Sequence, residues 1–424
     1  MSYPTMISYD EALQILRSLP LRPLGTQQIH FKDALNRICA KEVRAAHNVP
    51  SVPTSAMDGY AIAWRDLSLL ESSGLRLLAP NKAGNPTRPS LESGCAIKTF
   101  TGSLLPHNAD TLIIIEHIEQ RGDSIVLNEL GRELVAGFKQ GQWVRQVGDN
   151  YKQGELLLRP GDKIGAFEIG LLAELNCSFV EVYQRARVGV LCVGDEIVEV
   201  GQELNEEASG VVRSVNTHLL ESLLRAMGQE PLIYPIMRDD RAALRLAYER
   251  ALGECDVLLS TGGMSVGDYD FTKEIMQELT EMHFHKVRLK PGKPVACGIY
   301  KQGGRQCIAL GLPGYPNSCA LTFLLFGAPL LARLQGREWA QFRLSAQLAE
   351  PLKRSDTRME FRACDVRSEN GTLQVSFESK KSLQSSMINN LTHNTALALL
   401  PENGGDLDTG ERVEIILLSQ LVGA

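Results

Sequence analysis

The amino-acid sequence predicts a multidomain α/β protein built around a doubly wound α/β domain. Its 424 residues suffice for about two to four domains of ordinary size. A continuous, β-branched run at residues 187–193 is followed by two strand–helix–strand units, which indicates a parallel sheet covered on both faces. Short apolar segments separated by turn residues lie before and after this region and predict β-rich parts on either side.

The chain begins with a helix signal. Ser8 and Glu11 have the spacing of a capping box, in which each side chain accepts a hydrogen bond from the other residue's backbone N–H. Apolar residues at helical spacing follow, so we expect a first helix that ends near Pro20.

The N-terminal region as a whole is expected to cover residues 1–182. From residue 48 to 147 short apolar runs alternate with Gly, Pro and Asn, which is typical of a β-rich module. Helical spacing returns at residues 164–175. We therefore expect helical parts at 1–47 and 148–182 that belong together, with the β-rich module of 48–147 inserted between them.

The α/β domain is expected to cover residues 183–337. After the first strand, Asn216 precedes an amphipathic helix that ends at Gly228, and residues 231–237 then form the next strand. Crossovers between parallel strands are right-handed, so this unit starts a doubly wound sheet.

A second unit follows at once. Asp239 and Asp240 occupy the N-cap region of a helix that ends at Gly253, and residues 256–260 form the third strand. The apolar stretch at 320–332 is shorter than a membrane span and includes a proline, so we expect a buried helix.

The remaining residues, 338–424, are expected to form a small β domain. Short alternating segments surround Asn370-Gly371, a dipeptide that favours a tight hairpin turn. The last strand-like run lies at residues 413–418.

Composition excludes several classes of function. With 44 basic and 50 acidic residues the formal charge is −6, so no overall positive potential favours nucleic acid or an anionic membrane. The nine cysteines are odd in number and include no Cys-x-x-Cys pair, which argues against a disulfide framework and a zinc knuckle. The first residues do not have the pattern of a signal peptide. We expect a cytoplasmic protein.

Ligands of α/β sheets bind at the carboxyl ends of the strands, so the loops there are the first candidates for a site. Gly262, Gly263 and Gly267 follow the third strand and would let backbone N–H groups approach an anion such as phosphate. The alternative is a tight turn that needs positive φ at two glycines. A later strand leads through residues 313–318 into an apolar helix, whose N-terminal amides offer a second anion site.

Three lysines lie between these loops. Lys286, Lys290 and Lys293 carry compact charges suited to phosphate, and we expect them to converge near the glycine loop. The alternative for each lysine alone is a solvated surface charge.

Acidic residues also follow the strands: Asp195, Glu196, Asp239, Asp268 and Asp270. Carboxylates beside phosphates usually hold Mg²⁺, so they predict a magnesium-dependent reaction of a phosphorylated ligand. The alternative is that Asp239 and Asp270 only cap the helices that follow them.

Two loops of the N-terminal region are also candidates. Asp58-Gly59 forms a turn whose apolar neighbours, Met57 and Tyr60, are unusual in an exposed loop. Thr101 and Asp110 bound a second polar stretch without an evident structural need. His283 and His285 would share one side of a strand, but two histidines alone do not make a metal site.

Taken together, these motifs resemble the molybdopterin molybdenumtransferase family, which comprises bacterial MoeA proteins and the E domain of gephyrin. The resemblance spans essentially the whole chain. It is carried, in order, by SAMDGYA (55–61), TGSLLPHNAD (101–110), GDEI (194–197), TGGMSVGDYD (261–270), KPGKP (290–294) and LPGYP (312–316).

The resemblance implies molybdenum cofactor biosynthesis: molybdate is inserted into adenylylated molybdopterin with Mg²⁺-dependent release of AMP. It also implies a molybdopterin-binding α/β domain, a C-terminal domain like a β-barrel, a homodimer and a molybdopterin adenylyltransferase as partner. Among the motif positions, the catalytic ones are Asp58, Thr101, Glu196, Asp239 and Asp270, of which the last three would also hold the metal. The substrate-binding ones are Gly262, Gly263, Ser265, Lys286, Lys290, Lys293, Pro313, Gly314, Pro316, Arg358 (or Arg362) and Ser385. Asp58 and Thr101 match positions that complete the site from the other subunit.

Three positions depart from the family pattern. Asn150 stands where a carboxylate is usual, Tyr315 where the family has Asn, and Ser214 where it has Asp. An alternative function is therefore a catalytically impaired paralogue that binds molybdopterin or acts as a scaffold. A third possibility, adenylylation of molybdopterin itself, fits less well because it does not use the N-terminal motifs.

Overall fold

The computed structural model describes residues 3–203, 210–263, 271–339, 341–354, 356–380, 386–393 and 395–423. The chain separates into two compact units, one formed by residues 42–159 and the other by residues 1–41 together with 160–424. The smaller unit thus interrupts the larger one, as an inserted module does.

The smaller unit is β-rich, as the turn-rich sequence predicts. Its main sheet has six strands in the order β8-β5-β7-β6-β10-β9. The strands are β5 (Gly59–Ile62), β6 (Leu75–Asn81), β7 (Cys95–Thr99), β8 (Thr111–Ile114), β9 (Ile118–Arg121) and β10 (Ser124–Leu127). Helices α2 (Leu67–Ser72) and α3 (Glu129–Leu134) and the short strands β3 (Val43–Arg44), β4 (Thr54–Ser55), β11 (Val144–Arg145) and β12 (Leu156–Leu158) complete it.

A short linking region of the larger unit flanks this insertion in sequence. Strand β2 (Thr26–His30) pairs in antiparallel fashion with β13 (Phe179–Tyr183), and α4 (Ala166–Glu174) lies between them in sequence. This pairing joins a segment before the module to one after it.

The α/β domain has a seven-stranded sheet in the order β1-β19-β21-β22-β18-β14-β17. The pairs among β17, β14, β18 and β22 are parallel, whereas β21 runs antiparallel to both its neighbours. The strands are β1 (Thr5–Ile7), β14 (Arg187–Cys192), β17 (Glu230–Ile233), β18 (Val257–Thr261), β19 (Glu281–Val287), β21 (Ala296–Gln302) and β22 (Arg305–Leu312), with the short pair β15 (Ile197–Val198) and β16 (Val212–Arg213) beside the sheet.

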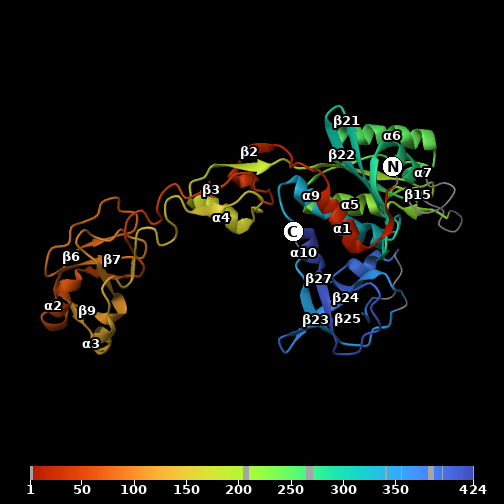
Figure 1. Ribbon diagram of the computed structural model, residues 1–424. Helices are drawn as coiled ribbons and strands as arrows, with labels where there is room; N and C mark the ends of the chain where they lie inside the picture. Colours follow the sequence, from red (N-terminus) through yellow and green to blue (C-terminus); the bar gives the residue numbers. More distant parts are fainter. Residues whose placement is uncertain are drawn as a thin grey trace. The chain divides into compact units, whose positions relative to one another are not determined.

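Helices cover both faces of this sheet. They are α1 (Tyr9–Ser18), α5 (Val215–Ala226), α6 (Arg241–Glu254), α7 (Phe271–Leu279), α8 (Pro316–Thr322) and α9 (Ala328–Leu334). Figure 1 shows α6 and α7 on one face and α1, α5 and α9 on the other. Strand β14 and the residue after it serve both faces: Val188 and Val190 pack into one core, and Leu191 and Val193 into the other. The doubly wound α/β fold is thus confirmed.

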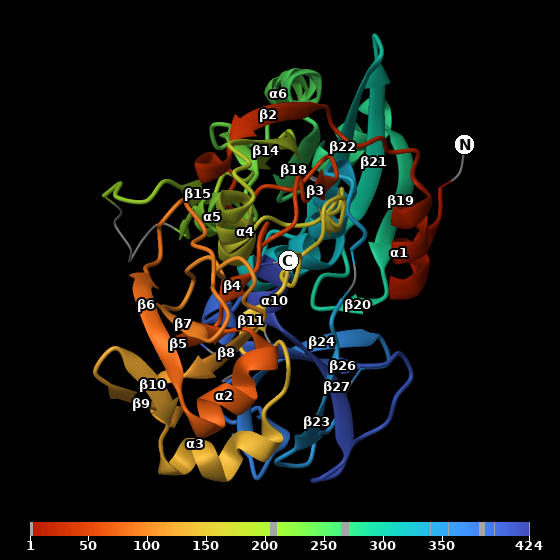
Figure 2. The ribbon, with the colours of Figure 1, turned by 90° about the vertical axis from the view of Figure 1, so that its left-hand side faces the viewer.

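Helix α1 belongs to the α/β domain, which differs from its expected place in the N-terminal region. The capping box forms as predicted, with Ser8 N–H donating to Glu11 Oε2 (2.7 Å) and Glu11 N–H to Ser8 Oγ (3.2 Å). Strand β1 pairs with β19, and Ala12 and Leu16 are buried in the core beside it. Figure 2 shows α1 alongside β19 and β21.

The helix from Pro316 to Leu334 is long and apolar enough to cross a membrane by length and composition, but 94% of its apolar window is buried within the fold. It passes through α8, a π-helical turn at Phe323–Gly327 and α9. The expected buried helix at 320–332 is therefore confirmed as a core element of the α/β domain.

The C-terminal domain is a closed five-stranded barrel. Strands β24, β25, β23, β27 and β26 pair in this order, and β26 closes the barrel by pairing with β24, while β20 (Leu289–Lys290) extends it. The bounds are β23 (Leu344–Leu348), β24 (Met359–Glu369), β25 (Thr372–Ser376), β26 (Thr395–Leu400) and β27 (Arg412–Leu417), followed by α10 (Leu418–Gly423). Asn370 and Gly371 both have positive φ and join β24 to β25, as the hairpin signal predicts.

Candidate active site

A cavity of about 680 Å³ opens where the parallel strands of the α/β sheet end. Strands β14, β18 and β22 each contribute the residues at or after their carboxyl ends. The described lining residues are Cys192, Val193, Glu196, Ile197, Val212, Arg213, Ser214, Val215, Asn216, Thr261, Gly262, Gly263, Pro294, Pro313, Gly314, Tyr315, Pro316 and Ser386. We call this the larger cavity, to distinguish it from a smaller one described below. Its position is the one expected for a ligand of a doubly wound sheet.

The glycine loop lies in the wall of the larger cavity. Gly262 has φ +91°, and a Cβ there would lie 2.1 Å from the carbonyl oxygen of Val193. Gly263 has φ +60°, and a Cβ there would lie 2.6 Å from Thr272 Oγ1. Both positions therefore require glycine for the turn, and both also face the cavity. The tight turn is thus observed, and anion binding by this loop stays a prediction.

Asn216 ties three elements of this wall to one another. Its Nδ2 donates to the carbonyl oxygen of Gly314 (2.7 Å) and to Thr261 Oγ1 (3.3 Å). Asn216 lies in the first turn of α5, so it joins that helix to the end of β18 and to the loop after β22. The sequence marks this residue only as the start of a helix.

The predicted carboxylates lie at one edge of the sheet but do not converge on one point. Glu196 lines the larger cavity, and its carboxylate makes no hydrogen bond or ion pair with any residue that the structure describes. The backbone N–H of Asp239 donates to Asp195 Oδ1 (3.4 Å), which places these two loops side by side. Asp240, and not Asp239, caps α6 through bonds from Ala242 N and Ala243 N.

Asp268, Asp270, Gly267, Ser265 and Ser385 lie outside the described residues. Among the described residues no three metal-binding side chains come together. Glu196 and Asp239 are therefore the parts of the expected magnesium site whose positions are known.

The three predicted lysines are not brought together in the larger cavity. None of them lines the larger cavity, to which their segment contributes Pro294. Lys290 lines a second cavity, whereas Lys286 is half-buried and Lys293 exposed, and neither is among the described lining residues of either cavity. A run of lysines in sequence spreads around a turning backbone, which explains the difference.

The second cavity has a volume of about 220 Å³ and lies between the α/β domain and the barrel. Its described lining residues are Lys290, Pro291, Asn317, Glu360, Phe361, Arg362, Ala363, Phe377, Lys380 and Asn390. It contains three cationic side chains and one carboxylate. We call it the cationic cavity.

Charges in the cationic cavity are only partly balanced. Glu360 is 2% exposed; it accepts a hydrogen bond from Arg362 Nε (2.7 Å) and lies 3.7 Å from Lys290 Nζ. Lys380 pairs with Asp365 (3.1 Å). Arg362 Nη2 is buried without a hydrogen-bond partner among the described residues. Glu360 Oε2 is also buried without a hydrogen-bond partner among these residues, but Lys290 Nζ lies 3.7 Å from it. A buried donor without a partner is costly, so the guanidinium of Arg362 is the group that a bound anion would satisfy.

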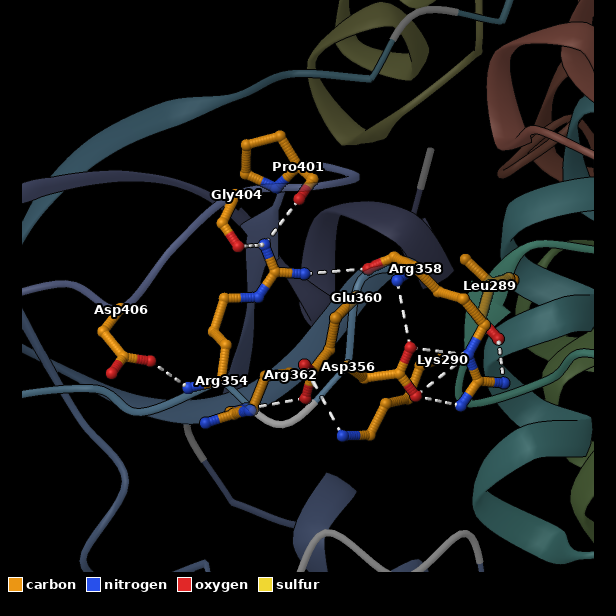
Figure 3. Close-up of polar contacts among 10 residues, drawn as sticks. All are labelled: Leu289, Lys290, Arg354, Asp356, Arg358, Glu360, Arg362, Pro401, Gly404 and Asp406. Atoms are coloured by element: carbon orange, nitrogen blue, oxygen red, sulfur yellow. Dashed lines mark hydrogen bonds and ion pairs between the residues drawn. The ribbon is translucent and has the colours of Figure 1, made fainter.

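Arg358, the other predicted arginine, has a structural role. Its guanidinium forms a bidentate ion pair with Asp356 and donates to the carbonyl oxygen of Leu289 (3.2 Å), and the pair keeps the pKa of Asp356 well below its usual range. Figure 3 shows Arg358 turned toward Asp356, while Lys290 and Arg362 both face Glu360. Arg362 is thus the better candidate for a ligand contact.

Three chain segments contribute to both cavities. At the start of α8, Pro316 lines the larger cavity and Asn317 the cationic one. The other two segments contribute Pro294 and Ser386 to the larger cavity, and Pro291 and Asn390 to the cationic one. Since adjacent Cα atoms lie about 3.8 Å apart, the two cavities adjoin at the start of α8.

In the smaller unit, the two predicted polar residues contact each other. Thr101 donates to Asp58 Oδ1 from its backbone N–H (2.8 Å) and from its hydroxyl (2.9 Å). These hydrogen bonds lower the pKa of Asp58. Gly59 is required beside it, because a Cβ would lie 2.3 Å from the carbonyl oxygen of Ile113.

Asp110 does have a structural need, contrary to the expectation. Its carboxylate accepts from the backbone N–H of Trp64 (2.7 Å), from Thr111 Oγ1 (3.0 Å) and from Gln140 Nε2 (2.7 Å). It fixes the start of β8, and the sequence could not show this because Trp64 and Gln140 are distant in the chain.

Two cations that line the cavities are absent from the sequence motifs. Arg213 lines the larger cavity and donates from Nη1 to the carbonyl oxygens of Glu199 (3.0 Å) and Gln202 (2.7 Å). Lys380 lines the cationic cavity. Neither belongs to a glycine-rich or acidic motif, so no local signal identifies it.

Comparison with known proteins agrees with the fold. Residues 7–176 match the family model "MoeA N-terminal region (domain I and II)", and residues 189–333 match "Probable molybdopterin binding domain". A curated protein of Haemophilus influenzae named molybdopterin molybdenumtransferase is 32% identical, over 99% of this chain and 100% of its own. Gephyrin of Dictyostelium discoideum is 25% identical over 98% of this chain and 63% of its own.

A solved structure has the same architecture. The molybdopterin biosynthesis MoeA protein of Pyrococcus horikoshii aligns with a TM-score of 0.79 and 26% identity, over 97% of this chain and 100% of the other. With both domain models in order and a relative matched from end to end, the chain belongs to the molybdopterin molybdenumtransferase family, a family of enzymes of molybdenum cofactor biosynthesis.

Proposed function

We propose that this protein inserts molybdate into adenylylated molybdopterin and releases AMP in a Mg²⁺-dependent reaction. The observation that carries this proposal is the pair of adjoining cavities that share three chain segments. One is large enough for an elongated, ring-containing ligand, and the other is small and cationic. Two substrates of unequal size can therefore meet at the start of α8.

The larger cavity would hold adenylylated molybdopterin. Gly262, Gly263 and Gly314 bring backbone close to the ligand without side chains in the way, which suits the phosphate groups. Arg213 adds a positive charge, and the flanking valines and prolines provide apolar walls for the rings.

The cationic cavity would hold molybdate before its transfer. Its three cationic side chains face two carboxylates, Glu360 and Asp365, so one positive charge is left for an anion such as molybdate. Arg362 Nη2 would find its missing acceptor in a molybdate oxygen, and Lys290 would supply a second charge-assisted contact. Ser385, which precedes the lining residue Ser386 of the larger cavity, remains a proposed contact.

Mg²⁺ would be held by Glu196, Asp239 and Asp270. Hard carboxylate oxygens are the donors that Mg²⁺ prefers, and the open carboxylate of Glu196 in the cavity wall fits this role. When bound, the ion would neutralise charge on the phosphate groups during cleavage.

Substitution of Arg362 tests the assignment of the cationic cavity. Arg362→Met keeps an apolar stem but removes the charge, so we expect AMP release to require at least about tenfold more molybdate. Arg367→Met lies on the same strand, outside both cavities, and should leave the molybdate requirement unchanged. Equal effects of the two substitutions would contradict the assignment.

A second candidate, a catalytically impaired paralogue, is favoured by the loop around Asn150. The Asn150 side chain accepts a hydrogen bond from Arg145, and the neighbouring Asp149 accepts from the backbone N–H of Gln146 (2.6 Å). Asp149 therefore does not replace the usual carboxylate. A large gain in AMP release by Asn150→Asp would support this candidate, and an unchanged rate would count against it.

The family resemblance extends the proposal to the assembly. We propose a cytoplasmic homodimer in which Asp58 and Thr101 of one subunit serve the site of the other, supplied with substrate by a molybdopterin adenylyltransferase. The contact between Asp58 and Thr101 supports their acting together.

A further inference from the structure

Tyr315 is an exposed aromatic residue in the wall of the larger cavity. Tyr315 is 62% exposed and lies between Gly314 and Pro316, which also line the cavity. The hydroxyl makes no hydrogen bond with any residue that the structure describes. Single exposed aromatics are common on surfaces, so exposure alone does not indicate a role.

The position of Tyr315 in the helix is unusual for its residue type. It is the N-cap of α8, with φ −71° and ψ 130°, and its side chain makes no capping hydrogen bond. N-caps favour Ser, Thr, Asp and Asn because their short side chains accept from the first-turn N–H groups. A tyrosine provides no such acceptor, so this residue does not serve the helix.

The backbone on both sides of Tyr315 is nevertheless firmly held. The Gly314 carbonyl accepts from the buried amide of Asn216 (2.7 Å), and the Tyr315 carbonyl accepts from Cys319 N–H (2.8 Å). Pro316 restricts the next φ angle. The ring is thus carried on a fixed support with only its two side-chain torsions free.

We propose that Tyr315 stacks on the planar heteroaromatic ring of the ligand in the larger cavity and determines how tightly that ring is held. This inference rests on the proposed function for the presence of such a ligand. The remaining lining residues include apolar side chains but no other aromatic, so among the described residues Tyr315 is the one that can offer a π-face. Stacking of an aromatic side chain on a base strengthens binding by about tenfold or more.

Two planar rings could occupy this place, the adenine or the pterin of the substrate. Binding of AMP, neopterin and ribose 5-phosphate, measured by calorimetry, separates them, since ribose 5-phosphate has no ring. We expect Tyr315→Ala to weaken binding of one ring-bearing probe about tenfold and leave ribose 5-phosphate unchanged. Tyr315→Phe should bind like the wild type. Phe342→Ala, at a position also 62% exposed but outside both cavities, is the matched control.

The substitution Tyr315→Asn gives a second, independent readout. Asparagine can cap α8, so the variant should melt at a higher temperature, yet it should bind the ring-bearing probe more weakly. A merely structural tyrosine would not produce these opposite changes.

The proposal is overturned if Tyr315→Ala leaves both AMP and neopterin binding unchanged, or if Tyr315→Asn binds them more tightly. Failure of the proposed function looks different: the wild type would then bind the probes and show the Tyr315 dependence, but would release no AMP from adenylylated molybdopterin and molybdate.

Discussion

At the scale of single residues, the glycine loop carries the most demanding geometry. Gly262 has positive φ and almost no room for a side chain, because a Cβ would lie 2.1 Å from a backbone carbonyl. Gly201, in the same domain, has a similar φ of +88° but nothing within 4 Å of its Cβ position. A comparison of substitutions at the two glycines therefore distinguishes the cost of the backbone conformation from the cost of the close contact.

We expect Gly201→Ala to lower the free energy of unfolding by about 1–2 kcal/mol, from the strained φ angle alone. Gly262→Ala should cost about 1–3 kcal/mol more, because the carbonyl of Val193 must move. It should also abolish ligand binding in the larger cavity. Urea denaturation of the two variants measures the difference, and equal losses would refute the role of the close contact.

Asp58 offers a test by titration. Both hydrogen bonds from Thr101 lower its pKa below the ordinary value of 3.8, so their contribution to stability is present above that value and is lost as the pH falls through the folded-state pKa. Thr101→Val keeps the backbone donor but removes the hydroxyl, and should raise the Asp58 pKa toward its ordinary value. Carboxyl NMR titration measures the pKa of Asp58 in each variant. Thr101→Ser should keep the lowered pKa of the wild type. A pKa in Thr101→Val equal to that of the wild type would contradict the role of the hydroxyl.

The candidate site was predictable where a residue type has one dominant use. Gly262 and Gly263 follow a buried strand, and glycine there signals positive φ or close approach. Arg358 lies just before β24 and Arg362 within it, and each pairs with an acidic residue two positions earlier. The sequence therefore cannot tell that Arg362 keeps a buried Nη2 without a hydrogen-bond partner among the described residues. The structural role of Asp110 could not be predicted, because its hydrogen-bond partners Trp64 and Gln140 lie far from it in the chain.

At the scale of elements, α1 is the clearest example of what a local pattern leaves open. Its capping box and apolar stripe predict a helix with one buried face, and both are observed. The pattern does not say which core receives that face. Only the pairing of β1 with β19 brings α1 to the α/β domain.

The capping box should be important for this docking. Ser8→Ala removes the side-chain acceptor of the Glu11 N–H and should lower the free energy of unfolding by about 1 kcal/mol. Ser18→Ala, at the other end of the same helix, is the control, since its hydroxyl bonds only the carbonyl of Ile15 within the helix. Thermal unfolding would contradict this account if Ser18→Ala were the more harmful change.

At the scale of the whole molecule, the sequence predicts an inserted β-rich module, an α/β domain and a small β domain, because periodicity and turn signals change along the chain. Closure of the C-terminal sheet into a barrel depends on β24 pairing with β26 across about 30 residues, which no local pattern encodes. The resemblance to a family supplied that feature.

The proposed sharing of sites between subunits can be tested by mixing two inactive variants. Asp58→Asn and Glu196→Gln would impair opposite halves of each shared site, so each mixed dimer should regain one intact site of its two. An equimolar mixture, in which about half of the dimers are mixed, should therefore regain about a quarter of the wild-type activity. The double variant Asp58→Asn/Glu196→Gln, taken through the same procedure without a second variant, should regain no activity. Absence of recovery in mixtures that demonstrably exchange subunits would contradict the shared site.

The central claim is that the adjoining cavities join molybdate to adenylylated molybdopterin. The most direct measurement is AMP release by the purified protein in the presence of adenylylated molybdopterin, molybdate and Mg²⁺. We expect stoichiometric AMP release that requires both molybdate and Mg²⁺. No release, under conditions in which another member of the family is active, would contradict it.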